Sequence, residues 1–213
     1  MPSATHQNVV ERLLTHAGTT YAQEAGIRLR DKPMPLFQLL MLCMLASKPI
    51  DAHIAVRAAR EMNRAGLRTA RGVQDAERSA LIRAFGRAHY VRYDESSATR
   101  ATEIAAAVTE NYGGDLRRLA VAGGRDVVET KRLLQQFKGI GDTGADIFLR
   151  EIQDIWTWAR PHFDERATAA AAELGLPDDP GALASLAPRR SAALAAALVR
   201  VSLNRELREK ILG

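Results

Sequence analysis

The sequence contains a single cysteine, Cys43. One thiol cannot form a disulfide within the chain, and it cannot supply the four thiolates of an iron–sulfur cluster or a four-cysteine metal site. Cys43 lies in the apolar run Leu36–Ala46, where a buried, unreactive thiol is a better interpretation than a nucleophile. We therefore expect no metal site, no iron–sulfur cluster and no other cofactor held by this residue.

Strand-like patterns and long apolar runs are also missing. Valine, isoleucine and threonine do not cluster into alternating runs, while alanine is plentiful, so the sequence predicts an all-α fold. The run Leu36–Ala46 is too short to span a bilayer, and the N-terminal Met-Pro-Ser-Ala-Thr-His lacks the regions of a signal peptide. We expect a cytoplasmic protein that does not contact a membrane. No feature indicates an oligomer, so a monomer is expected.

The chain carries a formal net charge of +5, and arginine supplies nearly all of the positive charge, since lysine occurs only at positions 32, 48, 131, 138 and 210. A basic chain suits a polyanionic partner, and arginine suits bidentate contacts with phosphate. A coding bias toward arginine would give the same composition. The charge alone leaves both interpretations open.

Apolar periodicity and capping residues divide the chain into helices. The run 36–46 is apolar on every side, as in a helix surrounded by others, and Asp51 is placed to cap the next helix. Arg57, Arg60 and Arg64 line one stripe of that helix, where exposure to solvent is favoured over phosphate contact. A loop is expected at 176–181. The expected helices span residues 7–25, 36–46, 51–65, 74–85, 96–112, 115–122, 126–137, 142–153, 163–174 and 188–209.

The segment Phe137–Gly141 places a Gly-hydrophobic-Gly turn between two of these helices. Glycines let the backbone turn tightly and approach a ligand without a Cβ in the way. A helix that begins directly after such a turn presents free N–H groups, which suit an anion such as a DNA phosphate. An ordinary turn between helices has the same pattern, so the turn alone does not decide between the two.

Five short segments follow one another in a specific order: Pro35-Leu-Phe-Gln-Leu-Leu, Leu45-Ala-Ser-Lys-Pro-Ile-Asp51, Arg100-Ala-Thr-Glu-Ile104, Phe137-Lys-Gly-Ile-Gly141 and Trp158-Ala-Arg-Pro161-His-Phe-Asp164. In this order and with these gaps, they resemble the helix-hairpin-helix/Gly-Pro-Asp superfamily of base-excision DNA glycosylases, which includes endonuclease III. The resemblance covers residues 35–168. It implies a two-lobed helical fold with a cleft between the lobes, and double-stranded DNA as the partner.

The resemblance also implies a division of the chain and a set of DNA contacts. Residues 35–137 would form a central six-helix lobe leading into the hairpin at 126–153, and 1–34 with 138–213 would form the second lobe. Hairpin carbonyls, including those of Lys138 and Ile140, would hold a monovalent cation. The residues expected to contact DNA are Lys138, Gly139, Ile140, Gly141, Thr143, Gly144 and Lys48.

Three positions differ from the pattern of the family. Lys48 stands where a glutamine fills the space left by a flipped base, and it either takes that role, contacts phosphate or is solvated. Asp142 replaces a basic residue and would repel phosphate unless a cation bridges the two. Thr143, or Gly144 if the alignment shifts by one residue, stands where the strand-cutting members have a lysine, and a threonine hydroxyl cannot form their imine. The resemblance therefore implies a glycosylase that leaves the DNA backbone intact.

Asp164 matches the aspartate that stabilises the sugar cation in the family, and it also precedes a helical pattern that it could cap. We expect catalysis by Asp164, and the same residue can also cap the helix.

Tyr90 and Tyr93 lie where aromatic side chains would stack on a base, although a surface loop would contain them equally well. The alternatives are a non-catalytic DNA-binding protein on the same fold and, with less support, an abasic-site lyase that uses another amine. The target base is not evident.

Overall fold

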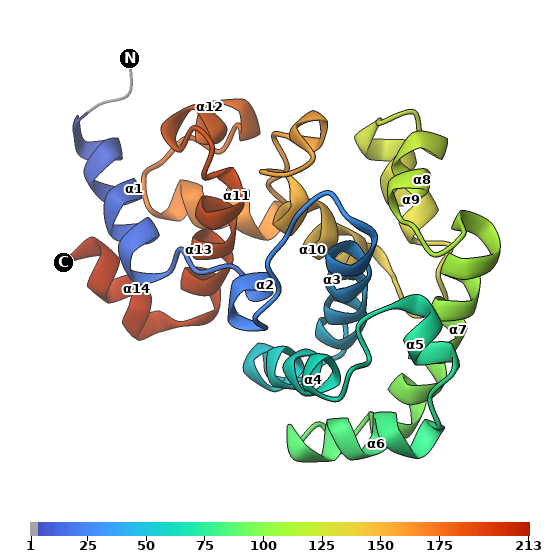
Figure 1. Cartoon of the computed structure of the whole chain (residues 1–213). Coiled ribbons are helices and arrows are strands. Elements are labelled where there is room, and N and C mark those ends of the chain that lie inside the picture. Colours follow the sequence, from blue (N-terminus) through green and yellow to red (C-terminus); the bar gives the residue numbers. More distant parts are fainter. Residues whose placement is uncertain (1–3) are drawn as a thin grey trace. The chain divides into compact units, whose positions relative to one another are not determined.

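The computed structural model describes residues 4–213, which form helices and no strand (Figure 1). This confirms the predicted all-α class. The chain divides into two compact units. Unit 1 contains the N-terminal residues up to Tyr21 together with Leu149–Gly213, and unit 2 is Ala22–Phe148. The sequence-based division placed the boundaries at residues 35 and 138, whereas here the segment 22–34 and the whole hairpin turn belong to unit 2.

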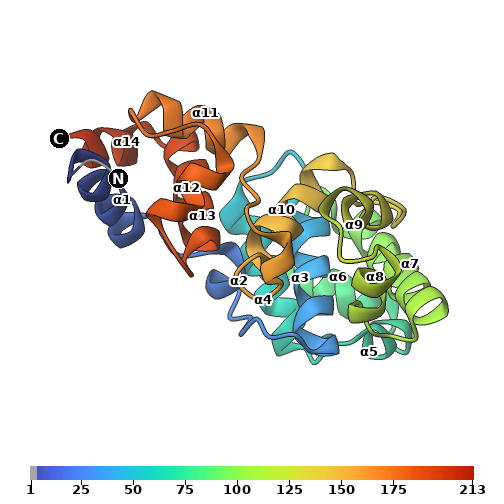
Figure 2. The ribbon, with the colours of Figure 1, turned by 90° about the horizontal axis from the view of Figure 1, so that it is seen from above.

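Unit 2 is arranged around α3 (Pro33–Ala46), which lies among the other helices of this unit (Figures 1 and 2). Every residue from Pro35 to Leu45 is buried, including Cys43. A proline at its first position starts the helix, and it ends before Pro49, because the residue before proline avoids helical geometry. The expectation of a central helix that is apolar on all sides is confirmed.

The other helices of unit 2 pack around α3 and against one another. α3 contacts α4 and α7, α5 lies against α7, and α6 packs on both α4 and α7. α10 crosses the boundary between the units, because unit 2 ends at Phe148. The bounds are α2 Tyr21–Glu24, α4 Ala52–Arg64, α5 Ala70–Gln74, α6 Arg78–Arg87, α7 Asp94–Tyr112, α8 Arg117–Ala122, α9 Val127–Leu134 and α10 Asp142–Ile152.

Unit 1 is built on α13, which packs against α11, α1 and α14. Small side chains such as Ala167, Ala171 and Ala195 are fully buried there and let the helix backbones approach closely. A short 3₁₀ helix at Thr157–Ala159 precedes this bundle. The bounds are α1 Ala4–His16, α11 Glu165–Glu173, α12 Pro180–Leu186, α13 Ser191–Leu203 and α14 Arg205–Leu212.

Several expected helices are interrupted. The helix expected at 7–25 breaks after His16, close to Gly18, whose backbone approaches Leu14 so closely that a Cβ would lie 2.5 Å from its carbonyl oxygen. The helix expected at 188–209 breaks at Asn204, whose side chain accepts a hydrogen bond from the N–H of Leu207 at 2.9 Å and caps α14. The helix expected at 74–85 is replaced by α5 and by α6, which begins at Arg78.

Capping residues account for several of the helix ends. Asp51 caps α4 as predicted, accepting from the N–H of His53 at 2.7 Å. Asp179 caps α12 inside the segment predicted to be a loop, with Pro180 at the first helical position. The left-handed Gly113 ends α7, which confirms the predicted stop at 113–114. Local chemistry thus explains the predicted start of α4, the predicted end of α7 and the start of α12, which was not predicted.

The arginine stripe of α4 is exposed at Arg57, Arg60 and Arg64, as favoured from the sequence. Within residues 4–213 no single helix is both long and apolar enough to cross a membrane. By length and composition alone, α12 and α13 meet that criterion together, as a pair bent by 110°.

Candidate nucleic-acid interface

The hairpin joins α9 to α10 through residues 135–141. The N–H of Phe137 donates to the carbonyl of Leu134 at 3.1 Å, and the N–H of Ile140 donates to the carbonyl of Phe137 at 2.9 Å. Between them Gly139 has a φ of +98°, a conformation that L side chains rarely adopt. The turn therefore depends on this glycine for its backbone path.

The three glycines of the hairpin have different surroundings. A Cβ on Gly144 would lie 2.5 Å from the Oγ of Ser47, whereas a Cβ on Gly141 would have no heavy atom within 4 Å. Ser47 follows the last residue of α3, and its Oγ is fixed by a 2.6 Å hydrogen bond to the carbonyl of Cys43. Gly144 therefore seats the first turn of α10 against the end of α3, and Gly141 leaves open space.

The predicted DNA contacts separate into accessible and buried positions. Lys138, Gly141 and Thr143 are exposed, and Gly139 and Lys48 are half-buried. Because α10 begins at Asp142, the N–H groups of its first turn have no acceptor within the helix. The buried positions are Ile140 and Gly144, which pack inside unit 2. In this structure those two residues support the turn instead of offering side-chain atoms to a ligand.

Asp142, expected to repel phosphate, has a partner inside the protein. The Nζ atom of Lys131 lies 2.8 Å from a carboxylate oxygen of Asp142 and 2.8 Å from one of Asp146. Burial, the largest single influence, lowers the pKa of Lys131, but the two carboxylates together outweigh it and the pKa lies above its ordinary value. Lys131 thus stays charged and offsets part of the negative charge at the start of α10.

A second set of charges lies on the other side of the turn. Glu103 of α7 accepts from Arg100 and lies 3.3 Å from the Nζ atom of Lys138. Hydrogen bonds from Arg100 and then Lys138 hold the pKa of Glu103 below its ordinary value. A Cβ on Gly139 would lie 3.3 Å from the Cδ atom of Arg100. The turn therefore rests on α7, and Lys138 is the most exposed cation beside it.

The fold thus brings together segments that are far apart in the sequence. Ser47, next to Lys48, touches the hairpin from one side, and Arg100 touches it from the other. The contact of Arg100 with Gly139 joins the segments 100–104 and 137–141, and the contact of Ser47 with Gly144 joins the segment 45–51 to the first turn of α10. All of them belong to unit 2.

Asp164 lies in unit 1, where both of its carboxylate oxygens have partners. One oxygen accepts from the N–H of Ala167 at 2.9 Å and caps α11, which confirms the capping interpretation. The other accepts from the guanidinium of Arg150 at 2.6 Å. The side chain of Arg150 is 4% exposed and that of Asp164 is 13% exposed. A catalytic role for Asp164 stays a prediction, and the capping role is a fact of the fold.

The segment before Asp164 is tied to α10. Gln153 donates to the carbonyl of His162 at 2.8 Å and accepts from its N–H at 2.9 Å. Arg150 also lies over the ring of Tyr21, 5.7 Å from its centroid. The position of the Asp164 carboxylate is therefore determined by Arg150 of α10, by Gln153 directly after that helix, and by the first turn of α11.

The two candidate stacking tyrosines have different environments. Tyr90 is fully buried, and its hydroxyl contacts the carbonyl of Leu45 at 3.3 Å and the Oγ of Ser97 at 3.2 Å. Burial raises the pKa of Tyr90. The expectation that it stacks on a base is therefore wrong for this structure, because its ring is part of the core. Tyr93 is half-buried, with Arg92 over its ring at 5.3 Å.

The sequence interpretation missed two functional-site neighbours, Arg150 and Lys131. Arg150 has a recognisable signal, because it directly follows the apolar residues Ile147, Phe148 and Leu149 in a continuous buried run, and a buried arginine needs an acidic partner. Lys131 has no such signal, since lysine on a mixed helix face is usually solvated.

No protein-family model, curated protein or solved structure matches the chain. Among the described residues, no group of three or more metal-ligating side chains comes together.

We predict that Gly144→Ala destabilises the protein by about 2 kcal/mol, because the added methyl group overlaps Ser47. Gly141→Ala is the matched control and should change the free energy of unfolding by less than about 0.5 kcal/mol. Urea denaturation of both variants measures this, and Ser47→Gly should recover part of the loss in Gly144→Ala. Equal losses for Gly141→Ala and Gly144→Ala would contradict the close approach.

A second prediction concerns the buried ion pair. Asp164→Asn keeps a capping side chain but leaves the charge of Arg150 buried, so we expect a loss of about 3 kcal/mol. Arg150→Met removes that charge together with the pair and should cost less. Chemical denaturation of the two single variants and the double variant gives the coupling energy. A coupling energy near zero would show that the pair contributes nothing.

Proposed function

We propose that the chain is a DNA-binding base-excision repair protein of the helix-hairpin-helix/Gly-Pro-Asp type. The observation that carries this proposal is that Arg100 lies against Gly139 of the hairpin turn and Ser47 lies against Gly144 in the first turn of α10, while Gly141 between them leaves open space. Free N–H groups at the start of α10 would bind a phosphate of double-stranded DNA, and Lys138 would add a positive charge. The protein would act in the cytoplasm as a monomer.

The reaction that fits these residues is hydrolysis of an N-glycosidic bond. A damaged or mismatched base would be rotated out of the duplex, with Lys48 contacting the duplex where the family's glutamine lies. The carboxylate of Asp164 would stabilise the positive charge that develops on the sugar and would orient the attacking water.

The residues of the hairpin favour a reaction that leaves the DNA backbone intact. Strand cutting by β-elimination needs an amine that forms an imine with the sugar. Thr143 offers a hydroxyl instead, and the amine of Lys138 precedes the glycines and lies beside Glu103. We therefore propose a monofunctional DNA glycosylase that leaves an abasic site. Carbonyls of the hairpin turn would hold a monovalent cation between the turn and the phosphate.

One observation favours a second candidate function, a DNA-binding protein without catalysis. Both oxygens of Asp164 are occupied by groups of the protein, Arg150 and the N–H of Ala167. An aspartate whose only roles are to cap α11 and neutralise Arg150 would have this same geometry. The two functions differ in whether the carboxylate itself is required for bond cleavage.

We predict alkali-dependent cleavage of one or more duplexes from a panel containing uracil, oxidised pyrimidines, 8-oxoguanine, alkylated purines, G·T mismatches and abasic sites. Asp164→Asn should abolish this activity, whereas Arg150→Met, which also breaks the ion pair, should retain part of it because the carboxylate remains and is still held by the N–H of Ala167. Circular dichroism at the assay temperature confirms that both variants are folded.

The remaining outcomes of that assay separate the alternatives. Duplex binding with no cleavage of any substrate favours the non-catalytic protein. Equal loss of activity in Asp164→Asn and Arg150→Met assigns Asp164 a purely structural role. A covalent complex trapped by borohydride shows an imine, which contradicts the monofunctional mechanism.

A separate prediction concerns Asp142, which is 73% exposed at the start of α10. Asp142→Asn removes a negative charge beside the proposed phosphate site and leaves Lys131 paired with Asp146 alone, so duplex affinity should rise by about threefold in low salt. Glu110→Gln, an exposed change on α7, is the charge-matched control. Fluorescence anisotropy at two salt concentrations measures the difference. The same increase in both variants would mean that net charge, and not the hairpin, governs binding.

A further inference from the structure

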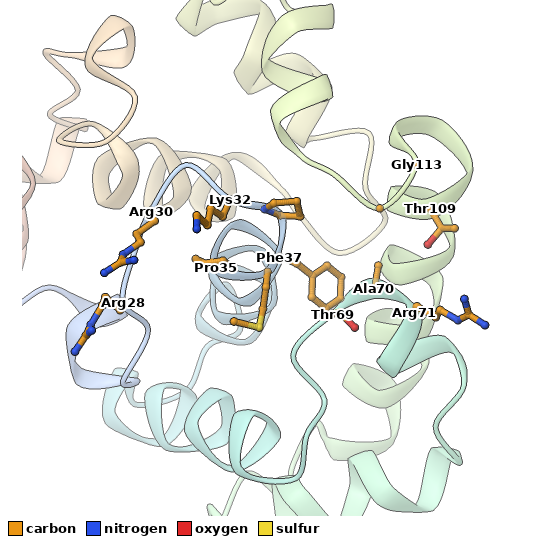
Figure 3. Close-up of a pocket in the computed structure, with 13 residues that line it drawn as sticks. Arg28, Arg30, Lys32, Pro35, Phe37, Thr69, Ala70, Arg71, Thr109 and Gly113 are labelled. Carbon is orange, nitrogen blue, oxygen red and sulfur yellow. The ribbon is translucent and has the colours of Figure 1, made fainter.

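Two adjoining hollows lie in unit 2 at the N-terminal end of α3, with volumes of about 760 Å³ and 500 Å³. They share Arg28, Met34 and Pro35 and therefore adjoin one another, and we name the two together the α3 groove. The larger hollow extends to α5 and to the end of α7 (Figure 3). The smaller hollow extends to α4.

The α3 groove is lined by cations and by no carboxylate. Arg28, Arg30, Lys32 and Arg71 border the larger hollow, and Arg28, Arg60, Arg64 and Arg68 border the smaller. Arg71 and Arg64 have acidic partners nearby, at 3.4 Å and 2.7 Å. In the part of the chain that the structure describes, no carboxylate pairs with Arg28, Arg30 or Lys32. The segment before α3, which lies wholly within the described residues, therefore carries three cations without an ion-pair partner, against the one carboxylate of Asp31.

The floor of the groove is apolar. Met34 is 43% exposed there, and Pro35 and Phe37 continue the surface inward (Figure 3). The prolines at positions 33 and 35 remove two of the N–H groups with which a helix start binds anions. Recognition of an anion at this place must therefore come from the arginine and lysine side chains.

We propose that the α3 groove binds an acidic peptide segment of a partner protein, with apolar side chains next to its carboxylates. The apolar side chains would enter the larger hollow over Met34, and the carboxylates would pair with Arg28, Arg30 and Lys32. Two joined hollows suit an extended chain better than a compact ligand. Single-stranded nucleic acid fits less well, because bases stack on exposed aromatic rings and Phe37, the aromatic residue of the lining, is 1% exposed.

The groove is separate from the hairpin. The hairpin touches Ser47 at the C-terminal end of α3, whereas the groove lies at Pro33–Phe37. A fourteen-residue helix is about 20 Å long. A peptide in the groove therefore needs no contact with the hairpin, and this proposal does not depend on the proposed function.

The test is selection of a random displayed library of peptides about twelve residues long on the immobilised full-length protein. Selected peptides are then synthesised with a fluorescent label and titrated with the protein. We expect enrichment of aspartate and glutamate beside leucine, isoleucine or phenylalanine. The groove variant Arg28→Ser/Arg30→Ser/Lys32→Ser should weaken binding at least about tenfold, and so should Met34→Asp, which places a carboxylate on the floor.

The charge-matched control is Arg57→Ser/Arg83→Ser/Arg166→Ser, which removes three exposed arginines outside the groove. It should change the affinity by less than about twofold. All variants change exposed side chains, and thermal melting confirms that they fold. The proposal is overturned if no acidic peptide is selected, or if the control variant weakens binding as much as the groove variant. It is also overturned if single-stranded DNA of similar length displaces the peptide from wild-type protein and binds through the same three cations.

Discussion

The close approach of α10 to the end of α3 is the constraint on which the candidate DNA-binding surface depends. Gly144 leaves no room for a side chain against Ser47, and Ser47 is held in turn by its bond to Cys43. This contact fixes where the hairpin turn lies relative to the segment that contains Lys48. Because α7 supports the turn from the other side, the exposed Gly141 lies on a surface determined by three separate helices.

The same helix links that surface to the buried ion pair. α10 begins at the hairpin and carries Arg150 in its last turn, and Arg150 holds the carboxylate of Asp164 at 2.6 Å. A carboxylate placed by a buried arginine and a helix N-terminus has a fixed position, as electrostatic catalysis requires. The arrangement has a cost, because both partners of the carboxylate compete with substrate for its negative charge. A variant of Arg150 therefore tests the role of the carboxylate as directly as a variant of Asp164.

Sequence reasoning predicted the features that depend on local chemistry. The all-helical class, the buried central helix, the cap at Asp51 and the stop at Gly113 followed from periodicity and capping residues, and the structure confirms them. The breaks at Gly18 and Asn204 were missed because apolar periodicity continues across them. Partners were missed for a different reason. The ion pairs of Lys131 with Asp142 and Asp146 join two helices, and no local sequence pattern predicts them. The burial of Tyr90 was missed because the sequence of its loop does not show whether the ring packs in the core or faces solvent.

The most direct test of the glycosylase proposal is mass spectrometry of the products formed from the duplex panel by the wild-type protein. The account predicts a free base and a full-length strand carrying an abasic site, with strand breaks only after alkali treatment. Release of no base from any duplex, or strand breaks before alkali, would contradict it.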